Sequence, residues 1–136
     1  MRIVTKETVT AFLARKPKSL GNTCSTGDEL RLHGNIIAYW ESDTCLILKM
    51  AGWGTATTRE RLNGVMALAQ GICDDIPALK FYQSKGEQKI ITMREAFQFD
   101  PIRNCLSVST LTGQVELLGT NYDGTSPCVL QPEACV

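Results

Sequence analysis

The stretch that decides the fold is residues 30–71, LRLHGNIIAYWESDTCLILKMAGWGTATTRERLNGVMALAQG. Two apolar runs, residues 30–33 and 36–40, flank the dipeptide Gly34-Asn35. Glycine and asparagine tolerate a positive φ, and such a pair between apolar runs favours a two-residue hairpin turn. The sequence therefore predicts a β-hairpin that turns at Gly34 and Asn35.

A second turn, residues 41–44, returns the chain into a third strand, residues 45–50, so that the region is a β-meander. With these turns Leu32 lies opposite Ile37, and one face collects the apolar side chains of Leu30, Leu32, Ile37, Tyr39, Leu46, Leu48 and Met50. Because a slip by one residue would scatter this set over both faces, the pattern supports the register. The opposite face mixes polar and apolar side chains, those of Arg31, His33, Ile36, Trp40, Ile47 and Lys49.

The residues after the meander predict the main helix. We expect it to begin at Thr57 or Thr58, because Thr57 and Glu60 have the spacing of a capping box. Gly71 is expected to stop it. The face that packs on the sheet is formed by side chains at helical spacing, those of Leu62, Val65, Met66, Ala69 and Ile72.

A shorter helix is predicted at residues 5–15, with Thr5 as its N-cap. Its apolar stripe consists of Val9, Phe12 and Leu13, and Pro17 prevents its continuation. Residues 21–28 are polar and are expected to form a loop.

Two further hairpins are predicted in the C-terminal half. In the first, residues 79–83 and 88–93 turn at Lys85-Gly86 and set Phe81 opposite Ile90. In the second, residues 106–111 and 114–118 turn at Thr112-Gly113, and one face is shared by Leu106, Val108, Val115 and Leu117. From Thr120 onward, turn-forming residues predict an irregular tail.

The predicted fold class is therefore α+β: an antiparallel sheet of about seven strands packed on one main helix, with a short N-terminal helix. A chain of 136 residues suits one domain over residues 1–136. We expect its core at about residues 5–93 and an additional hairpin and tail at about residues 94–136.

The composition limits the classes of function. Lys+Arg and Asp+Glu both number 14, and this balance disfavours non-specific binding to nucleic acid, which draws on a basic surplus. No apolar run approaches the ~20 residues of a membrane span. The first residues lack the hydrophobic centre of a signal peptide, so we expect a cytoplasmic protein with reduced thiols. Cys45, Cys73 and Cys105 are then expected to be small buried side chains, and Cys128 and Cys135 are the pair most prone to oxidise.

No sequence motif predicts catalysis. A phosphate-binding loop, a GxSxG elbow and an HExxH motif are all missing from the sequence, and a single histidine offers little for a zinc site. We therefore expect a protein that is not an enzyme and that needs no cofactor or metal. The remaining enzymatic alternative is a thiol or hydrolytic site built from Cys24, His33 and Asp74, which requires those side chains to meet in one pocket.

The first alternative, ahead of the enzymatic one, is nucleic-acid binding through the basic side chains of Arg15, Lys16, Lys18, Arg59 and Arg61. Residues 57–61 have two readings: hydroxyl and guanidinium groups at a helix N-terminus can hold a phosphate, or the same residues cap the helix and pair with each other. Glu60 places a negative charge at that position and favours the capping interpretation. The two tryptophans, Trp40 and Trp53, suit a protein interface if exposed and the core if buried.

Two segments carry a resemblance to a family. The hairpin LRLHGNIIA at residues 30–38 and the helix start AGWGTATTRERLN at residues 51–63 resemble small uncharacterised proteins of tailed bacteriophages and prophages. Those proteins are similar over about residues 8–93, including a hairpin like that at residues 82–86. The resemblance supplies no catalytic residues. It implies a phage accessory protein that acts in the cytoplasm of a bacterial host.

Our leading hypothesis is a non-enzymatic protein that binds a host or phage protein, as an inhibitor of a bacterial defence or regulatory factor. The predicted contact surface is the mixed face of the meander around Arg31, His33, Ile36 and Trp40. The oligomeric state is left open by the sequence.

Overall fold

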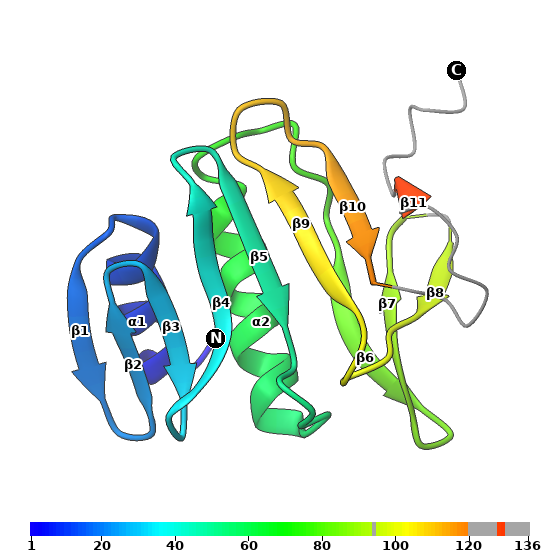
Figure 1. Cartoon of the computed structure of the whole chain (residues 1–136), viewed down its shortest axis with the longest axis horizontal. Coiled ribbons are helices and arrows are strands. Elements are labelled where there is room, and N and C mark those ends of the chain that lie inside the picture. The colour runs from blue at the N-terminus through cyan, green and yellow to red at the C-terminus, as the bar shows by residue number, and fades with distance from the viewer. Residues whose placement is uncertain (94, 120–127, 130–136) are drawn as a thin grey trace.

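The computed structural model describes residues 1–93, 95–119 and 128–129. Within these residues the chain forms two helices and eleven strands (Figure 1). Their order is α1 (Ile3–Leu13), β1 (Pro17–Leu20), β2 (Thr23–Thr26), β3 (Glu29–Leu32), β4 (Asn35–Ser42), β5 (Cys45–Lys49), α2 (Ala56–Ala69), β6 (Lys80–Ser84), β7 (Glu87–Ile91), β8 (Ala96–Gln98), β9 (Cys105–Ser109), β10 (Val115–Leu118) and β11 (Cys128–Val129).

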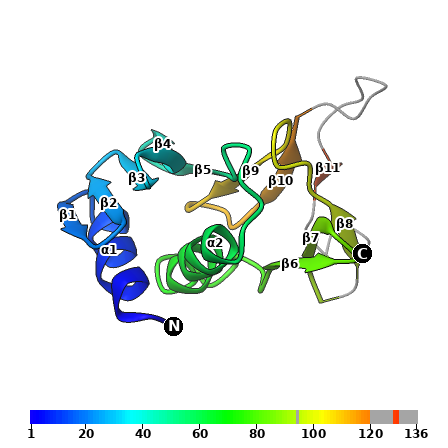
Figure 2. The same cartoon turned by 90° about the horizontal axis from the view of Figure 1, so that it is seen from below.

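The described strands form two antiparallel sheets, a large one in the order β1-β2-β3-β4-β5-β9-β10-β11 and a small one in the order β6-β7-β8. Both helices and the small sheet lie on one face of the large sheet, with α1 at the β1–β3 end and α2 in the middle (Figures 1 and 2). The predicted α+β class, with a main helix and a short N-terminal helix, is confirmed. The strands exceed the predicted seven and are divided between two sheets.

The turn between β3 and β4 lies one residue earlier than predicted. His33 (φ 51°) and Gly34 (φ 83°) both have positive φ, as a type I′ turn requires, and Leu32 pairs with Asn35. The prediction placed Asn35 inside the turn. A positive φ is uncommon for a residue other than glycine, although histidine is among those that adopt it more often.

A β-bulge then changes the register along β4. Arg31 pairs with Ile36 and Leu30 pairs with Ala38, so Ile37 is the additional residue between these pairs. Ile37 and Ala38 are both buried. The predicted register, with Leu32 opposite Ile37, is therefore wrong, because turn and bulge together shift the pairing.

The bulge exchanges the predicted faces of Tyr39 and Trp40. Trp40 lies on the helix side of the sheet, where its ring centroid is 5.9 Å from that of Phe12 and its Nε1 donates to the Phe12 carbonyl at 3.0 Å. Tyr39 alternates with it and lies on the outer face, with the Lys49 ammonium 5.6 Å from its ring centroid. The prediction that Trp40 belongs to the mixed face is wrong.

The N-terminal third contains more regular structure than predicted. Helix α1 begins at Ile3 with Arg2 at the N-cap position, and Thr5 lies buried inside the helix and does not cap it. Val9 and Phe12 are buried as predicted. The predicted loop at residues 21–28 contains strand β2, which pairs with β1 and β3.

The apolar face of α2 is confirmed, since the side chains of Leu62, Val65, Met66 and Ala69 are buried. The helix ends at Ala69, and Ile72 beyond it is 49% exposed rather than packed on the sheet. On its other side α2 holds the small sheet through Asn63. The Asn63 Nδ2 donates to the Phe81 carbonyl at 3.0 Å and the Phe81 N–H donates to Asn63 Oδ1 at 2.6 Å, so one side chain takes the place of a neighbouring strand.

Both C-terminal hairpins are confirmed. Phe81 pairs with Ile90 across β6 and β7, and Val108 pairs with Val115 across β9 and β10. Strand β8 is additional, and β9 pairs with β5, so the C-terminal hairpin completes the large sheet. The predicted irregular tail lies outside the described residues except for β11, and so do the side chains of the predicted pair, Cys128 and Cys135.

Candidate functional site

An open cavity of about 380 Å³ lies at the N-terminal end of α2, between the β3–β4 turn and the loop that follows β5. Leu32, Ile37 and Met50 contribute apolar, buried side chains to it. No aspartate, glutamate, lysine or arginine is among the lining residues. An apolar cavity with a few polar groups at its border is the usual form of a binding site.

Trp53 forms one wall of this cavity. After β5 the chain reverses at Ala51 (φ 54°) and Gly52 (φ 85°), and the Trp53 N–H donates to the Met50 carbonyl at 2.9 Å. The reversal points the indole away from the core, and Trp53 is 59% exposed. An indole buries a large apolar area when it is covered, so this wall is the candidate contact surface.

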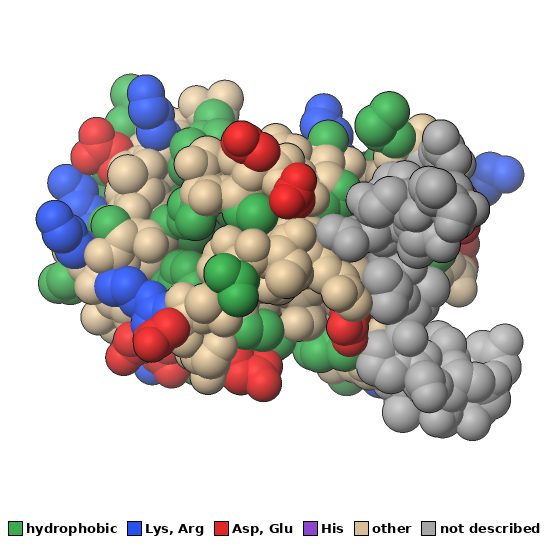
Figure 3. Space-filling view, turned by 90° about the horizontal axis from the view of Figure 1, so that it is seen from above, with side chains coloured by type: hydrophobic (Ala, Val, Ile, Leu, Met, Phe, Trp, Pro, Cys, Tyr) green, Lys and Arg blue, Asp and Glu red, His purple; other side chains and the backbone are tan. Residues whose placement is uncertain are grey.

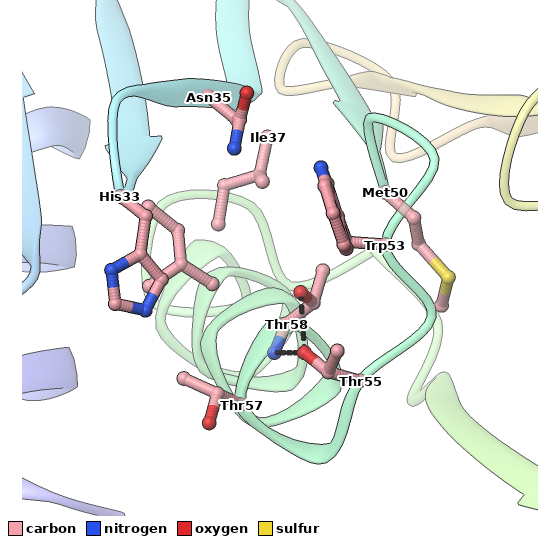
Figure 4. A pocket seen from close by; sticks show the side chains of 9 residues that line it. His33, Asn35, Ile37, Met50, Trp53, Thr55, Thr57 and Thr58 are labelled. Atoms are coloured by element: carbon pink, nitrogen blue, oxygen red, sulfur yellow. Dashed lines mark hydrogen bonds between the residues drawn. The ribbon is translucent and has the colours of Figure 1, made fainter.

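His33 forms the opposite wall. Its backbone N–H donates to the Asn22 carbonyl at 2.9 Å, which holds the β3–β4 turn against the start of β2. Figure 4 shows the imidazole of His33 and the indole of Trp53 on opposite sides of the cavity, with Ile37 between them. Of the residues predicted to bind a partner, His33 therefore lines the cavity. Arg31 and Ile36, which pair with each other across the same hairpin, do not.

The threonines at the start of α2 form the third side. Thr55 is the N-cap, since its Oγ1 accepts the N–H of Thr58 at 3.2 Å, and the two hydroxyls are 2.9 Å apart. The predicted capping box of Thr57 and Glu60 is wrong. Thr57 lines the cavity instead, and its hydroxyl makes no hydrogen bond within the described part of the chain.

Arg59 connects the start of α2 with the small sheet. Its Nη1 donates to the Gly54 carbonyl at 3.0 Å, to Gln83 Oε1 at 3.0 Å and to Gln88 Oε1 at 2.9 Å. These bonds fix the loop that carries Trp53 against strands β6 and β7. The role of Arg59 in the structure is thus to position the cavity wall.

Arg61 is 1% exposed and connects both helices with β2. Its Nε donates to Thr23 Oγ1 at 2.8 Å, its Nη1 to Thr5 Oγ1 at 3.0 Å and its Nη2 to Asn22 Oδ1 at 3.0 Å. It also pairs with Glu60. A buried guanidinium with these partners does not reach a phosphate, so the predicted nucleic-acid contact of Arg61 is wrong.

Glu60 belongs to the same network. Burial alone would raise the pKa of its carboxyl, but hydrogen bonds from the Thr5 hydroxyl and the Arg61 guanidinium, together with the Arg2 N–H, lower the pKa below its ordinary value. The carboxylate is therefore a structural anion that joins α1 to α2.

The remaining predicted basic residues lie elsewhere. The guanidinium of Arg15 is 4.0 Å from the Trp40 ring centroid and donates to the Ser42 carbonyl at 2.9 Å, and Lys18 pairs with Glu7 at 3.2 Å. Viewed from above, many of the visible Lys and Arg side chains lie over the α1–β1 end, beside Asp and Glu (Figure 3). Lys16 lies at the same end, whereas Arg59 contacts the small sheet, so the structure does not bring the five residues together.

The side chains of the enzymatic alternative do not meet. His33 lies at the N-terminal end of α2 and Asp74 follows its C-terminal end, and a helix of 14 residues is about 20 Å long. Cys24 pairs with Arg31 in the ladder and does not line the cavity. Within the described ranges, no group of three or more His, Cys, Asp or Glu residues is placed to hold a metal ion.

The thiols that the structure describes are free and half-buried, those of Cys24, Cys45, Cys73 and Cys105. The predicted burial of Cys45, Cys73 and Cys105 is therefore only partial. Burial raises the pKa of the Cys105 thiol more than the charge of Lys49 lowers it. A thiol with a raised pKa carries little of the reactive thiolate at neutral pH.

A family model described as Kyanoviridae Gp96 protein matches residues 1–101. The chain belongs to the Kyanoviridae Gp96 protein family. The predicted phage origin is confirmed, and the family match extends beyond the predicted end of the resemblance at about residue 93. The matched range, residues 1–101, includes every residue that lines the cavity, whereas strands β9, β10 and β11 lie after the end of that range. No match was found among curated proteins or solved structures. No helix in the described ranges of this family member is long and apolar enough to cross a membrane.

Proposed function

We propose that this phage protein acts by binding another protein and that the cavity beside Trp53 is the contact site. The observation that carries the proposal is the 59% exposure of Trp53 at the border of an apolar cavity. Tryptophan is among the residues that contribute most to binding when a partner covers it. Of the predicted contact surface, only His33 belongs to the proposed site. The tryptophan of the proposed site is Trp53, not Trp40.

The site is built to be rigid, which favours specific recognition. Leu32, Ile37 and Met50 belong to the hydrophobic core, and the Arg59 hydrogen bonds hold the loop of Trp53. A preformed surface binds without the entropic cost of ordering a loop. We further propose that the partner is a host defence or regulatory factor in the bacterial cytoplasm, and that the protein inhibits it by occupancy, without chemistry.

Nucleic-acid binding is the weaker candidate. Arg61 is buried, Lys18 is paired with Glu7, and Arg15 lies over Trp40. Arg15, Lys16 and Lys18 are exposed at one end of the molecule, but Arg15 lies beside Asp43 and Lys18 beside Glu7, so acidic side chains offset this basic cluster. Binding to the phosphate backbone draws on several cations at once.

Affinity purification from phage-infected host cells tests the proposal. The tagged full chain is compared with Trp53→Ala and with Leu111→Ala, a matched control that shortens another exposed apolar side chain, 74% exposed, in the β9–β10 turn. We expect one protein to co-purify at stoichiometric yield with the wild type and the control, and to be lost with Trp53→Ala. Equal recovery with all three would place the contact elsewhere. Failure to recover any protein would contradict protein binding.

A further inference from the structure

We infer that the cavity receives one uncharged aromatic side chain of the partner, a phenol or an indole, between Trp53 and His33. This inference rests on the proposed function and names the chemistry that the site recognises. It follows from the size of the cavity, the nature of its walls and the absence of charge.

The size suits a single ring. A cavity of about 150 Å³ holds benzene, and pockets for drug-sized ligands begin at about 300 Å³. The cavity measures about 380 Å³ and is open to solvent. A phenol or an indole therefore fits together with part of the chain that presents it.

The walls favour an aromatic occupant over an aliphatic one. The indole of Trp53 and the imidazole of His33 lie on opposite sides of the cavity, and Ile37 lies between them (Figure 4). Aromatic rings attract each other in offset-stacked or edge-to-face arrangements, beyond the contribution of buried area. An occupant ring between the two walls gains this attraction from both, and an aliphatic group gains only the burial.

The lining of the site disfavours anionic occupants. The lining residues include no acidic residue and no lysine or arginine, and the adjacent Arg59 guanidinium is held by Gly54, Gln83 and Gln88. A carboxylate or phosphate placed here would lose its hydration without gaining an ion partner.

The border of the cavity offers hydrogen bonds to a polar edge of the ring. The Asn35 amide and the Thr57 hydroxyl line the cavity, and neither makes a side-chain hydrogen bond within residues 1–93 and 95–119. An amide and a hydroxyl both donate and accept, so they can bind a phenol O–H or an indole N–H. Phenol and indole therefore suit the site better than an unsubstituted phenyl ring.

Titration of the full chain with side-chain analogues tests the inference. Binding is monitored by ¹H–¹⁵N NMR, as chemical-shift changes of the backbone N–H groups of His33 and Thr57 and of the Trp53 indole N–H. The probes are p-cresol and indole, with cyclohexanol as an aliphatic of similar size, and adenosine monophosphate and tetramethylammonium as charged probes. We expect p-cresol and indole to bind with a Kd on the order of 1 mM. Cyclohexanol should bind about 2–10-fold more weakly, the factor that aromatic pairing contributes.

Trp53→Leu keeps an apolar wall but removes one of the two rings, so it should lower the preference for p-cresol over cyclohexanol. Leu111→Ala should leave that preference unchanged. Equal affinity for cyclohexanol and p-cresol in the wild type, binding of the charged probes alone, or no binding at all would each overturn the inference. A partner that is lost with Trp53→Ala in the affinity purification, while the probes fail to bind, would leave the proposed function in place and show a flat contact instead of an inserted ring.

Discussion

Replacement of Arg61 by alanine should lower the free energy of unfolding more than any other single truncation of a charged side chain described above. Arg61 is 1% exposed and donates hydrogen bonds to Thr5 on α1, to Thr23 on β2 and to Asn22 in the turn before β2, besides pairing with Glu60. Alanine removes the guanidinium donor from Thr5 and Thr23 in the interior, and Asn22 Oδ1 keeps only the Thr23 hydroxyl as a donor. The perturbation therefore tests whether one side chain holds three elements together.

The magnitude follows from the burial of the network. Removal of one member of a buried ion pair costs about 3–5 kcal/mol, because the other member is left unpaired. The side chain of Glu60 is 30% exposed, so water recovers part of the loss, and the lower end of that range applies. A loss of about 3 kcal/mol is a large fraction of the 5–15 kcal/mol of a typical domain. It corresponds to a shift of about 1–3 M in the urea midpoint.

Urea denaturation followed by circular dichroism measures this shift. Arg61→Lys should lose a smaller amount, since an ammonium keeps the charge but lacks the planar fork that reaches several acceptors. Arg103→Ala is the control, because Arg103 is exposed and its guanidinium donates no hydrogen bond within the described residues. If Arg61→Ala moves the midpoint no further than Arg103→Ala, the network does not stabilise the fold and the reasoning is refuted.

Three further predictions concern the start and the face of α2. Because the folded-state pKa of Glu60 is lowered from its ordinary value of 4.5, its ionised form stabilises the protein above that pH, and this contribution is lost as the pH falls through the folded-state value. Urea midpoints should therefore fall more steeply between about pH 5 and pH 3 for the wild type than for Glu60→Gln; parallel curves would contradict this. Thr55→Ala should cost about 1 kcal/mol and Thr57→Ala should cost nothing, since only Thr55 caps the helix; the opposite ranking would restore the capping box. Asn63→Leu should cost about 1–3 kcal/mol and accelerate hydrogen exchange at the Phe81 N–H, which loses its acceptor; unchanged exchange would show that water or another group already serves that N–H.

Local turn chemistry and apolar periodicity predicted the elements whose partners are close in sequence. The hairpin that pairs Phe81 with Ile90 and the one that pairs Val108 with Val115 are both confirmed. In each hairpin a glycine after a polar residue sets the turn, and the strands alternate between apolar and polar side chains. Strands β1 and β2 were not predicted, because short polar strands are stabilised by a neighbouring strand and a covering helix rather than by their own pattern.

The candidate site was predicted in part. His33 belongs to the predicted contact surface and lines the cavity, whereas Trp53 lines the cavity and is not part of the predicted surface. A tryptophan between two glycines, outside every periodic segment, is the sequence signal that distinguishes it. Trp40 lies in an apolar strand and is covered by Phe12. The chain reverses before Trp53 through the positive φ of Ala51 and Gly52, and only the one at Gly52 is favoured by its residue type.

The sequence by itself determined that a helix begins near Thr57 and that its apolar stripe packs on a sheet. The tertiary structure alone decided what the helix start does. The Arg61 acceptors, Thr5 and Thr23, lie 56 and 38 positions away in the chain, and the Glu60 carboxylate binds Thr5 of α1 in addition to Arg61 of its own helix. Capping and pairing rules concern residues three or four positions apart, so they do not predict partners that only folding brings together. The same limit applies to the cavity, because its walls come from a turn and a loop that only the packed sheet and helix place opposite each other.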